Sequence, residues 1–120
     1  MTTILRRTAL LAVLFGLASL AWADNSAVVG TWNCVATDGA KAKWQWTLVI
    51  ADNNGTLSGT ATGHAGTLPL SNMAFDGTNL TFSVATNDQS YSVQLTVTGT
   101  TMSGSYTGTD NGTVQARLQQ

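Results

Sequence analysis

The 120-residue chain contains no glutamate and has only one cysteine, one proline and one histidine. Its six acidic residues are all aspartates, and its five lysines and arginines bring the formal net charge to −1. Binding to nucleic acid or to an anionic lipid surface requires a cluster of positive charge. No such cluster is present, so we expect no nucleic-acid partner.

The same scarcity argues against several kinds of catalytic and metal site. Glycoside hydrolysis needs two apposed carboxylates, whereas the aspartates are scattered over separate turn-like clusters. A structural zinc site needs four cysteine or histidine ligands, and the chain offers only Cys34 and His64. The Asp52–Gly55 segment resembles a calcium loop but is too short for a full set of ligands. We therefore predict a protein that is not an enzyme, with no metal and no cofactor.

The two remaining reactive side chains have simpler interpretations. Cys34 shares its predicted face with Trp32, which favours an inert thiol in the core over a nucleophile. A lone cysteine also cannot form an internal disulfide. His64 lies in a glycine-bearing connection with no nucleophile or carboxylate spaced to work with it. We expect an exposed loop histidine, with contact to a ligand at the rim of a site as the alternative.

Residues 1–23 have the pattern of a helical secretory signal peptide. Arg6 and Arg7 form the positive region, residues 8–20 form the apolar region, and Ala21 and Ala23 supply the small residues before the cleavage point. The apolar region is too short for a span of about 20 residues. We therefore predict cleavage between Ala23 and Asp24, a periplasmic or secreted location, and no integral membrane span after cleavage. Residues 24–120 then form a single domain.

Long runs of helical periodicity are also absent after residue 23, and alternation takes their place. Residues 44–63 form two alternating runs joined by an Asp-Asn-Asn-Gly turn, and a similar pair of runs returns at residues 91–108. Trp46 corresponds to Tyr91, and Leu57 corresponds to Met102. Such a repeat is typical of one copied supersecondary unit, and here the unit is a β-hairpin.

Eight strands are predicted between clusters of Asp, Asn and Gly. Their approximate bounds are Val28–Ala36, Ala42–Ala51, Thr56–Thr62, Leu68–Phe75, Leu80–Thr86, Ser90–Thr98, Thr101–Gly108 and Thr113–Leu118. One face of these strands is apolar and the other is mostly Thr, Ser and Gln. In the fourth strand the apolar residues fall on both parities, which leaves its inward face open.

Eight short antiparallel strands that are apolar on one side close most simply into an all-β, eight-stranded, up-and-down barrel. A two-sheet β-sandwich is the alternative. An outer-membrane barrel would need its apolar residues outside. Here the outward residues would be Thr and Ser, so we expect the apolar face to point inward.

Short motifs along the chain resemble the lipocalin and avidin group of barrels. They are Gly30-Thr31-Trp32, Leu57-Ser58-Gly59-Thr60 and residues 100–106, Thr-Thr-Met-Ser-Gly-Ser-Tyr. The resemblance implies that Gly30 and Trp32 close one end of the barrel and that a basic residue of the last strand, Arg117, packs near the tryptophan. Met102 and Phe82 stand where avidins carry biotin-contacting tryptophans, so the resemblance implies the fold without biotin binding.

The inward aromatic residues suggest a ligand site. Small residues facing bulky aromatic ones favour a partly open apolar pocket, with tyrosine hydroxyls as polar handles. We predict a small hydrophobic or aromatic ligand in the barrel mouth, near the loop at residues 63–68. The predicted site residues are Trp44, Trp46, Phe82, Tyr91, Tyr106, Gly59, Gly104 and His64. The alternative is a filled core, with a protein or polysaccharide partner on the outer face of an envelope, secreted or inhibitory module.

Overall fold

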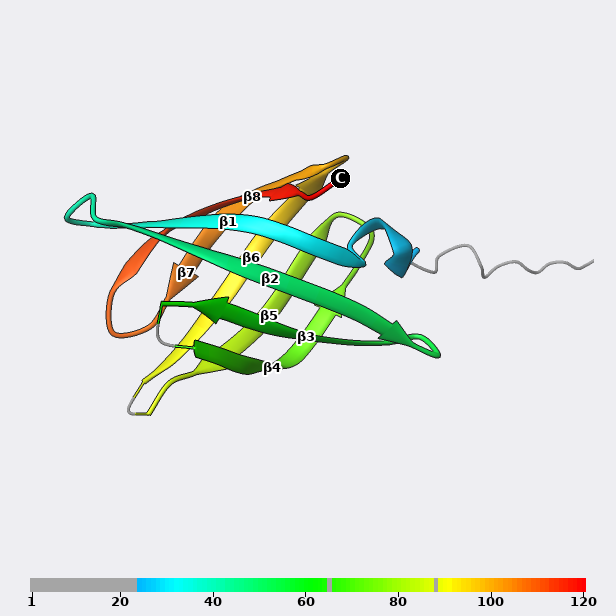
Figure 1. Cartoon of the computed structure of the whole chain (residues 1–120), viewed down its shortest axis with the longest axis horizontal. Helices are drawn as coiled ribbons and strands as arrows, with labels where there is room; N and C mark the ends of the chain where they lie inside the picture. The colour runs from blue at the N-terminus through cyan, green and yellow to red at the C-terminus, as the bar shows by residue number, and fades with distance from the viewer. Residues whose placement is uncertain (1–23, 65, 88) are drawn as a thin grey trace, which may run out of the picture.

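The computed structural model describes residues 24–64, 66–87 and 89–120 and forms a closed β-barrel (Figure 1). Each strand pairs antiparallel with the next, and the last strand pairs with the first. The prediction of an eight-stranded, antiparallel, up-and-down barrel is therefore confirmed, and the sandwich alternative is wrong. The predicted signal peptide lies outside the described residues.

All eight predicted strands are present, with bounds close to those expected. They are β1 (Gly30–Asp38), β2 (Lys43–Asn53), β3 (Thr56–Gly63), β4 (Gly66–Phe75), β5 (Asn79–Ala85), β6 (Ser90–Thr98), β7 (Thr101–Thr107) and β8 (Asn111–Leu118). A short 3₁₀ helix, η3 (Asn25–Ala27), precedes β1. Among the described residues no helix has the length and apolarity to cross a membrane.

Aspartates build the turns, as their clustering with Asn and Gly predicts. In the β2–β3 turn Asn54 and Gly55 both have positive φ, and the Gly55 amide donates to the Asp52 carboxylate at 2.8 Å. This is the backbone of a tight hairpin turn whose twist suits the flanking strands. Asp38 and Asp76 accept backbone N–H groups in the same way at the β1–β2 and β4–β5 turns.

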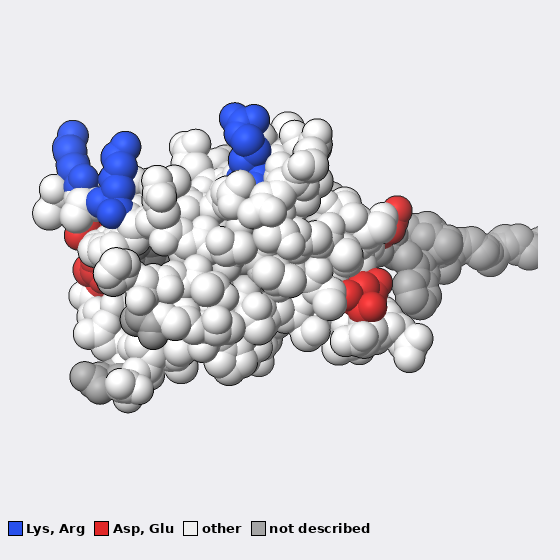
Figure 2. Space-filling view, in the orientation of Figure 1, with Lys and Arg blue, Asp and Glu red and all other residues white. Residues whose placement is uncertain are grey.

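The alternation along the strands separates a core from an outer face. The buried apolar residues are Val28, Trp32, Cys34, Leu48, Ile50, Leu80, Phe82, Val93, Leu95, Met102, Tyr106, Val114 and Ala116. Apart from Val28, all lie in β-strands and share one parity within each strand, as the predicted inward apolar face requires. The outward positions of β6 and β8 are exposed Ser, Gln, Thr and Arg. Figure 2 shows one side of the molecule, which is largely uncharged and carries a few basic and acidic side chains.

A register break explains why β4 carries apolar residues on both parities. Pairing with β5 shifts between Ser71 and Ala74, and Asn72 has a left-handed backbone with φ of 54°. An extra residue of this kind reverses the alternation beyond it. Both Leu70, before the break, and Met73, after it, therefore pack against the core.

One end of the barrel is closed by Trp32. The Trp32 side chain is fully buried, and its Nε1–H donates to the Val28 carbonyl at 2.9 Å. η3 leads into this closed end (Figure 1), and Gly30 has φ of 138°, a conformation that favours glycine. Arg117 is exposed, on the face of β8 opposite to that of the inward Ala116. The structure thus places this basic residue on the outer face, whereas the resemblance implied packing near Trp32.

The sequence repeat is also a repeat of contacts. A Cβ on Gly59 of β3 would lie 2.7 Å from the Val49 carbonyl oxygen, and one on Gly104 of β7 would lie 1.9 Å from the Gln94 carbonyl oxygen. The two glycines hold corresponding positions in the β2–β3 and β6–β7 hairpins. In both hairpins, glycine therefore allows the neighbouring strand to approach closely.

Candidate ligand-binding site

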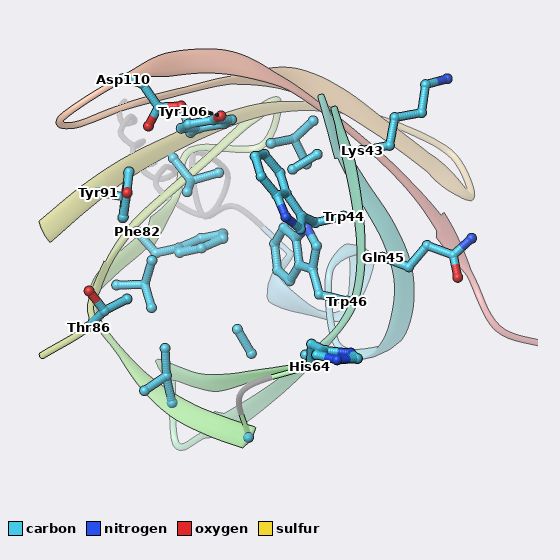
Figure 3. A pocket seen from close by; sticks show the side chains of 18 residues that line it. Lys43, Trp44, Gln45, Trp46, His64, Phe82, Thr86, Tyr91, Tyr106 and Asp110 are labelled. Carbon is cyan, nitrogen blue, oxygen red and sulfur yellow. Dashed lines mark hydrogen bonds between the residues drawn. The ribbon is translucent and has the colours of Figure 1, made fainter. Parts of the chain in front are cut away.

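The end of the barrel opposite Trp32 contains a cavity of about 800 Å³ (Figure 3). It lies where β1, β3, β5 and β7 end and where β2, β4, β6 and β8 begin. Ligand pockets for small molecules span roughly 300–1,000 Å³. The residues that line it are Ala36, Lys43, Trp44, Gln45, Trp46, Ala61, Gly63, His64, Gly66, Leu68, Phe82, Val84, Thr86, Tyr91, Val93, Tyr106, Asp110 and Val114.

Two tryptophans of β2 form one wall of the cavity. Trp44 and Trp46 are two residues apart, so both side chains point inward from the same strand. Figure 3 shows them on one side of the cavity, with Phe82 on the other side pointing toward them. Trp44 is 49% exposed, whereas Phe82 is buried. The aromatic wall therefore extends from the core to the solvent at the mouth.

Two tyrosines form another part of the wall, and glycines fix their rings. The Tyr91 and Tyr106 rings pack edge to face, with centroids 5.8 Å apart and planes at 75°. A Cβ on Gly112 would lie 2.5 Å from the Tyr106 ring, and one on Gly108 would lie 2.4 Å from the Tyr91 ring. Each ring thus lies over a glycine where any other residue would displace it.

Polar groups at the mouth hold the tyrosine hydroxyls. Tyr106 Oη donates to Asp110 Oδ2 at 3.2 Å. Burial, followed by the negative charge of Asp110, raises the pKa of Tyr106 to about 12. Tyr91 Oη donates to Gln89 Oε1 and lies 3.2 Å from Thr109 Oγ1. At neutral pH Tyr106 therefore presents a neutral hydroxyl beside a carboxylate.

The structure brings together six of the eight residues that the sequence suggested. Trp44, Trp46, His64, Phe82, Tyr91 and Tyr106 all line the cavity. Gly59 and Gly104 do not, because they face neighbouring strand backbone and the core. The cavity is instead widened by other small residues on the wall, among them Ala36 and Ala61.

Sequence reasoning missed Asp110 as a site residue. Its Asp-Asn-Gly context indicates a turn, and the clusters around Asp38, Asp52 and Asp76 are indeed turns. Asp110 differs because its carboxylate accepts the Tyr106 hydroxyl at the cavity mouth. The signal in the sequence was the spacing: Asp110 follows Tyr106, which is predicted to point inward, by four residues.

The potentially reactive side chains lie apart from one another. Cys34 is buried, and burial raises the pKa of its thiol to about 12. His64 is exposed at the rim of the cavity. Within the part of the chain that the structure describes, no three His, Cys, Asp or Glu residues are grouped to hold a metal ion. The arrangement is suited to noncovalent binding of an apolar molecule.

No protein-family model and no curated protein matches the chain. Among solved structures it is similar to a redesigned β-barrel, b11L5F_LGL, with a TM-score of 0.68 and 15% identity over 86% of this chain and 100% of that one. It is also similar to EF1p2_mFAP2b bound to DFHBI, with a TM-score of 0.60 and 12% identity over 85% of this chain and 100% of that one. At these identities the likeness shows an eight-stranded β-barrel fold.

Proposed function

We propose that this protein is an exported, non-enzymatic β-barrel that binds a small hydrophobic or aromatic molecule in its open mouth. The observation that carries the proposal is the cavity of about 800 Å³ with five aromatic side chains on its wall. Burial of an apolar ligand surface there contributes roughly 25 cal/mol per Å² before the costs of association. The similar barrel EF1p2_mFAP2b, solved with the small aromatic molecule DFHBI, supports this use of the architecture.

Export is part of the proposal and rests on the amino-terminal sequence. Arg6 and Arg7, the apolar stretch after them and the small residues at Ala21 and Ala23 are typical of a cleaved signal peptide. A periplasmic or secreted carrier would meet its ligand outside the cytoplasm. The Gly30-Thr31-Trp32 motif at the closed end supports a relation to the lipocalin and avidin group of barrels.

A binding role without catalysis agrees with the chemistry of the described residues. A nucleophilic cysteine needs a lowered pKa, whereas the buried Cys34 has a raised one. A general base needs a partner within hydrogen-bond reach. Because His64 is exposed at the rim, we assign it contact with the edge of a ligand rather than proton transfer.

Native mass spectrometry tests the proposal most directly. The mature protein is purified from the periplasm, its native and denatured masses are compared, and any passenger is extracted into organic solvent. A reproducible extra mass that is lost on denaturation supports the carrier function and identifies the ligand. A clean mass is followed by a panel of lipids and aromatic metabolites, read by tryptophan fluorescence and melting temperature. If no compound changes either signal, the proposal is wrong.

A matched pair of variants locates the binding. Trp44→Ala removes an exposed aromatic wall of the cavity and is expected to weaken binding on the order of tenfold. Val29→Ala removes a similarly exposed apolar side chain near the closed end, and binding should not change. Equal effects of the two substitutions would place the ligand elsewhere.

The alternative function is a protein or polysaccharide partner on the Ser- and Thr-rich outer face. A hollow of about 360 Å³ on β5, β6 and β7, with Thr81, Ser83, Ser92 and Gln94 on its wall, favours it. The cavity at the mouth argues against the filled core that this alternative requires. Recovery of a stoichiometric partner from envelope extracts, together with no ligand for the mouth, would make it the better explanation.

A further inference from the structure

The charge at the mouth of the cavity narrows the class of ligand. Of the described residues on the cavity wall, Asp110 is acidic and Lys43 is basic, and His64 lies at the rim. Figure 3 shows Lys43 pointing away from the cavity, whereas Asp110 lies beside Tyr106. The Lys43 ammonium is thus directed away from the space that a ligand would occupy, and the carboxylate remains at its edge.

The Tyr106 hydroxyl lies in a negative electrostatic field at the mouth of the cavity. Tyr106 Oη donates to Asp110 Oδ2 at 3.2 Å, so the two groups form one polar edge on an otherwise apolar wall. After the effect of burial, the charges of Asp110 and Asp38 both raise the pKa of Tyr106. Both carboxylates therefore act on this side of the mouth, and a positive group placed there would be stabilised.

The aromatic walls favour the same sign of charge. The face of a tryptophan, tyrosine or phenylalanine ring is negative and attracts a cation within about 6 Å of its centre, tryptophan most strongly. Trp44 and Trp46 line one side of the cavity, and Tyr91 and Tyr106 line another. A desolvated cation between such walls gains from any ring face that it contacts, as well as from Asp110.

From this geometry we infer that the ligand is a small organic cation that joins an apolar or aromatic body to an ammonium group. The inference rests on the proposed function and specifies its ligand. The apolar body lies between the β2 tryptophans and Phe82, and the ammonium group lies toward Tyr106 and Asp110. An anionic ligand of the same size would meet the carboxylate and the negative ring faces and would be disfavoured.

Two probes of the same shape test the sign of the charge. Phenyltrimethylammonium and tert-butylbenzene differ in replacing a charged nitrogen by a carbon. Their affinities for the mature protein are measured by tryptophan fluorescence and by NMR. We use low ionic strength because salt screens an exposed carboxylate. The cation is expected to bind at least about tenfold more tightly than the neutral probe, as cation–π and carboxylate contacts together imply.

Substitutions then assign the preference to the mouth. Asp110→Asn should reduce the ratio of cation to neutral affinity severalfold, and Tyr106→Phe should reduce it less. Asp52→Asn changes the net charge by the same amount in a turn at the closed end, and it should leave the ratio unchanged. Equal effects of Asp110→Asn and Asp52→Asn would overturn the assignment to Asp110.

The two levels of the proposal fail in different ways. If tert-butylbenzene binds as tightly as phenyltrimethylammonium, the cation inference is wrong and the apolar ligand site stands. If neither probe binds, and no compound in the panel of lipids and aromatic metabolites binds, the proposed function is wrong as well.

Discussion

Gly104 shows how tightly the barrel wall is packed at the residue scale. A Cβ at this position would lie 1.9 Å from the Gln94 carbonyl oxygen and 2.9 Å from Leu95 Cα, so strand backbone would have to move. We expect Gly104→Ala to lower the free energy of unfolding by about 1–3 kcal/mol, as overpacking does. Urea unfolding monitored by tryptophan fluorescence measures this change.

The control is Gly39→Ala, in the β1–β2 turn. No atom lies within 4 Å of a Cβ built on Gly39, and its φ is not in the left-handed region. Its stability should stay within about 0.5 kcal/mol of that of the unsubstituted protein. Similar losses at both positions would show that close strand approach at Gly104 is not what the glycine provides.

Tyr106 gives a prediction for the alkaline pH range. Its pKa is raised from an ordinary value of 10 to about 12, mainly by burial and then by Asp110 and Asp38. Between these pH values the unfolded chain loses the tyrosine proton while the folded chain keeps it. The unfolded state is therefore favoured as pH rises. The stability from this group is complete below about pH 10 and is lost as pH approaches about 12.

Urea unfolding at about pH 9 and about pH 11.5 measures this loss. Tyr106→Phe removes the titrating hydroxyl, so the variant should lose less stability between the two pH values than the unsubstituted protein does. Absorbance near the tyrosinate band gives the pKa independently. The same pH dependence in both proteins would contradict the assignment to Tyr106.

Individual residues also show what sequence patterns can and cannot predict. Alternation correctly places Trp46 and Tyr91 inside because a strand turns every second side chain to the same face. Alternation gives no distance between strands. It therefore does not reveal that Gly104 is a point of close backbone contact rather than part of the space for a ligand. The pairing of Tyr106 with Asp110 depends on how the loop after β7 folds, which alternation does not describe.

At the scale of elements, the Trp32 side chain of β1 links the closed end of the barrel to the segment that follows η3. Trp32 fills this end and donates to the Val28 carbonyl. Trp32→Phe leaves that carbonyl without its partner and removes packed volume. We expect a loss of about 2–4 kcal/mol of stability. Trp44→Phe, at a half-exposed position of the mouth, should change stability by less than about 1 kcal/mol and weaken ligand binding instead.

Thermal and urea unfolding of both variants, together with a binding titration, separates the two ends. The expected pattern is loss of stability in the first variant and loss of affinity in the second. If Trp44→Phe destabilises the barrel as much as Trp32→Phe does, the two ends do not have the separate roles described here.

β4 marks the limit of sequence reasoning for a whole element. A strand has one inward parity only while its register is continuous, and the break between Ser71 and Ala74 gives β4 two. Asn72 in the left-handed region is the residue type that tolerates this conformation. The mixed parity and the asparagine together indicate a break in this strand. The sequence alone does not say at which neighbouring strand the pairing shifts.

For the whole molecule, the repeat accounts for the regular wall, and the differences between its copies create the site. Trp46 in the β2–β3 hairpin corresponds to Tyr91 in the β6–β7 hairpin, and both lie on the cavity wall. One wall is therefore apolar and the other carries hydroxyl groups. Toward the closed end the corresponding residues, Ile50 and Leu95, are buried in the core. The interior is therefore filled at one end of the barrel and hollow at the other.

A barrel that is hollow at one end should respond differently to added volume at its two ends. Ala61 lies on the cavity wall, whereas Ala116 is buried in the filled part of the core. Ala61→Leu should keep or raise stability, by up to about 1–2 kcal/mol, because the added carbons fill open space. It should also weaken ligand binding because the same space is no longer open.

Ala116→Leu adds the same atoms where no space remains and should lower stability by about 1–3 kcal/mol. Urea unfolding and ligand titration of the two variants compare the ends within one scaffold. The opposite signs of the stability changes follow from the position of the cavity rather than from the substitution. A loss of stability in Ala61→Leu as large as that in Ala116→Leu would mean that the mouth is closed in solution. The site would then have to be sought on the outer face.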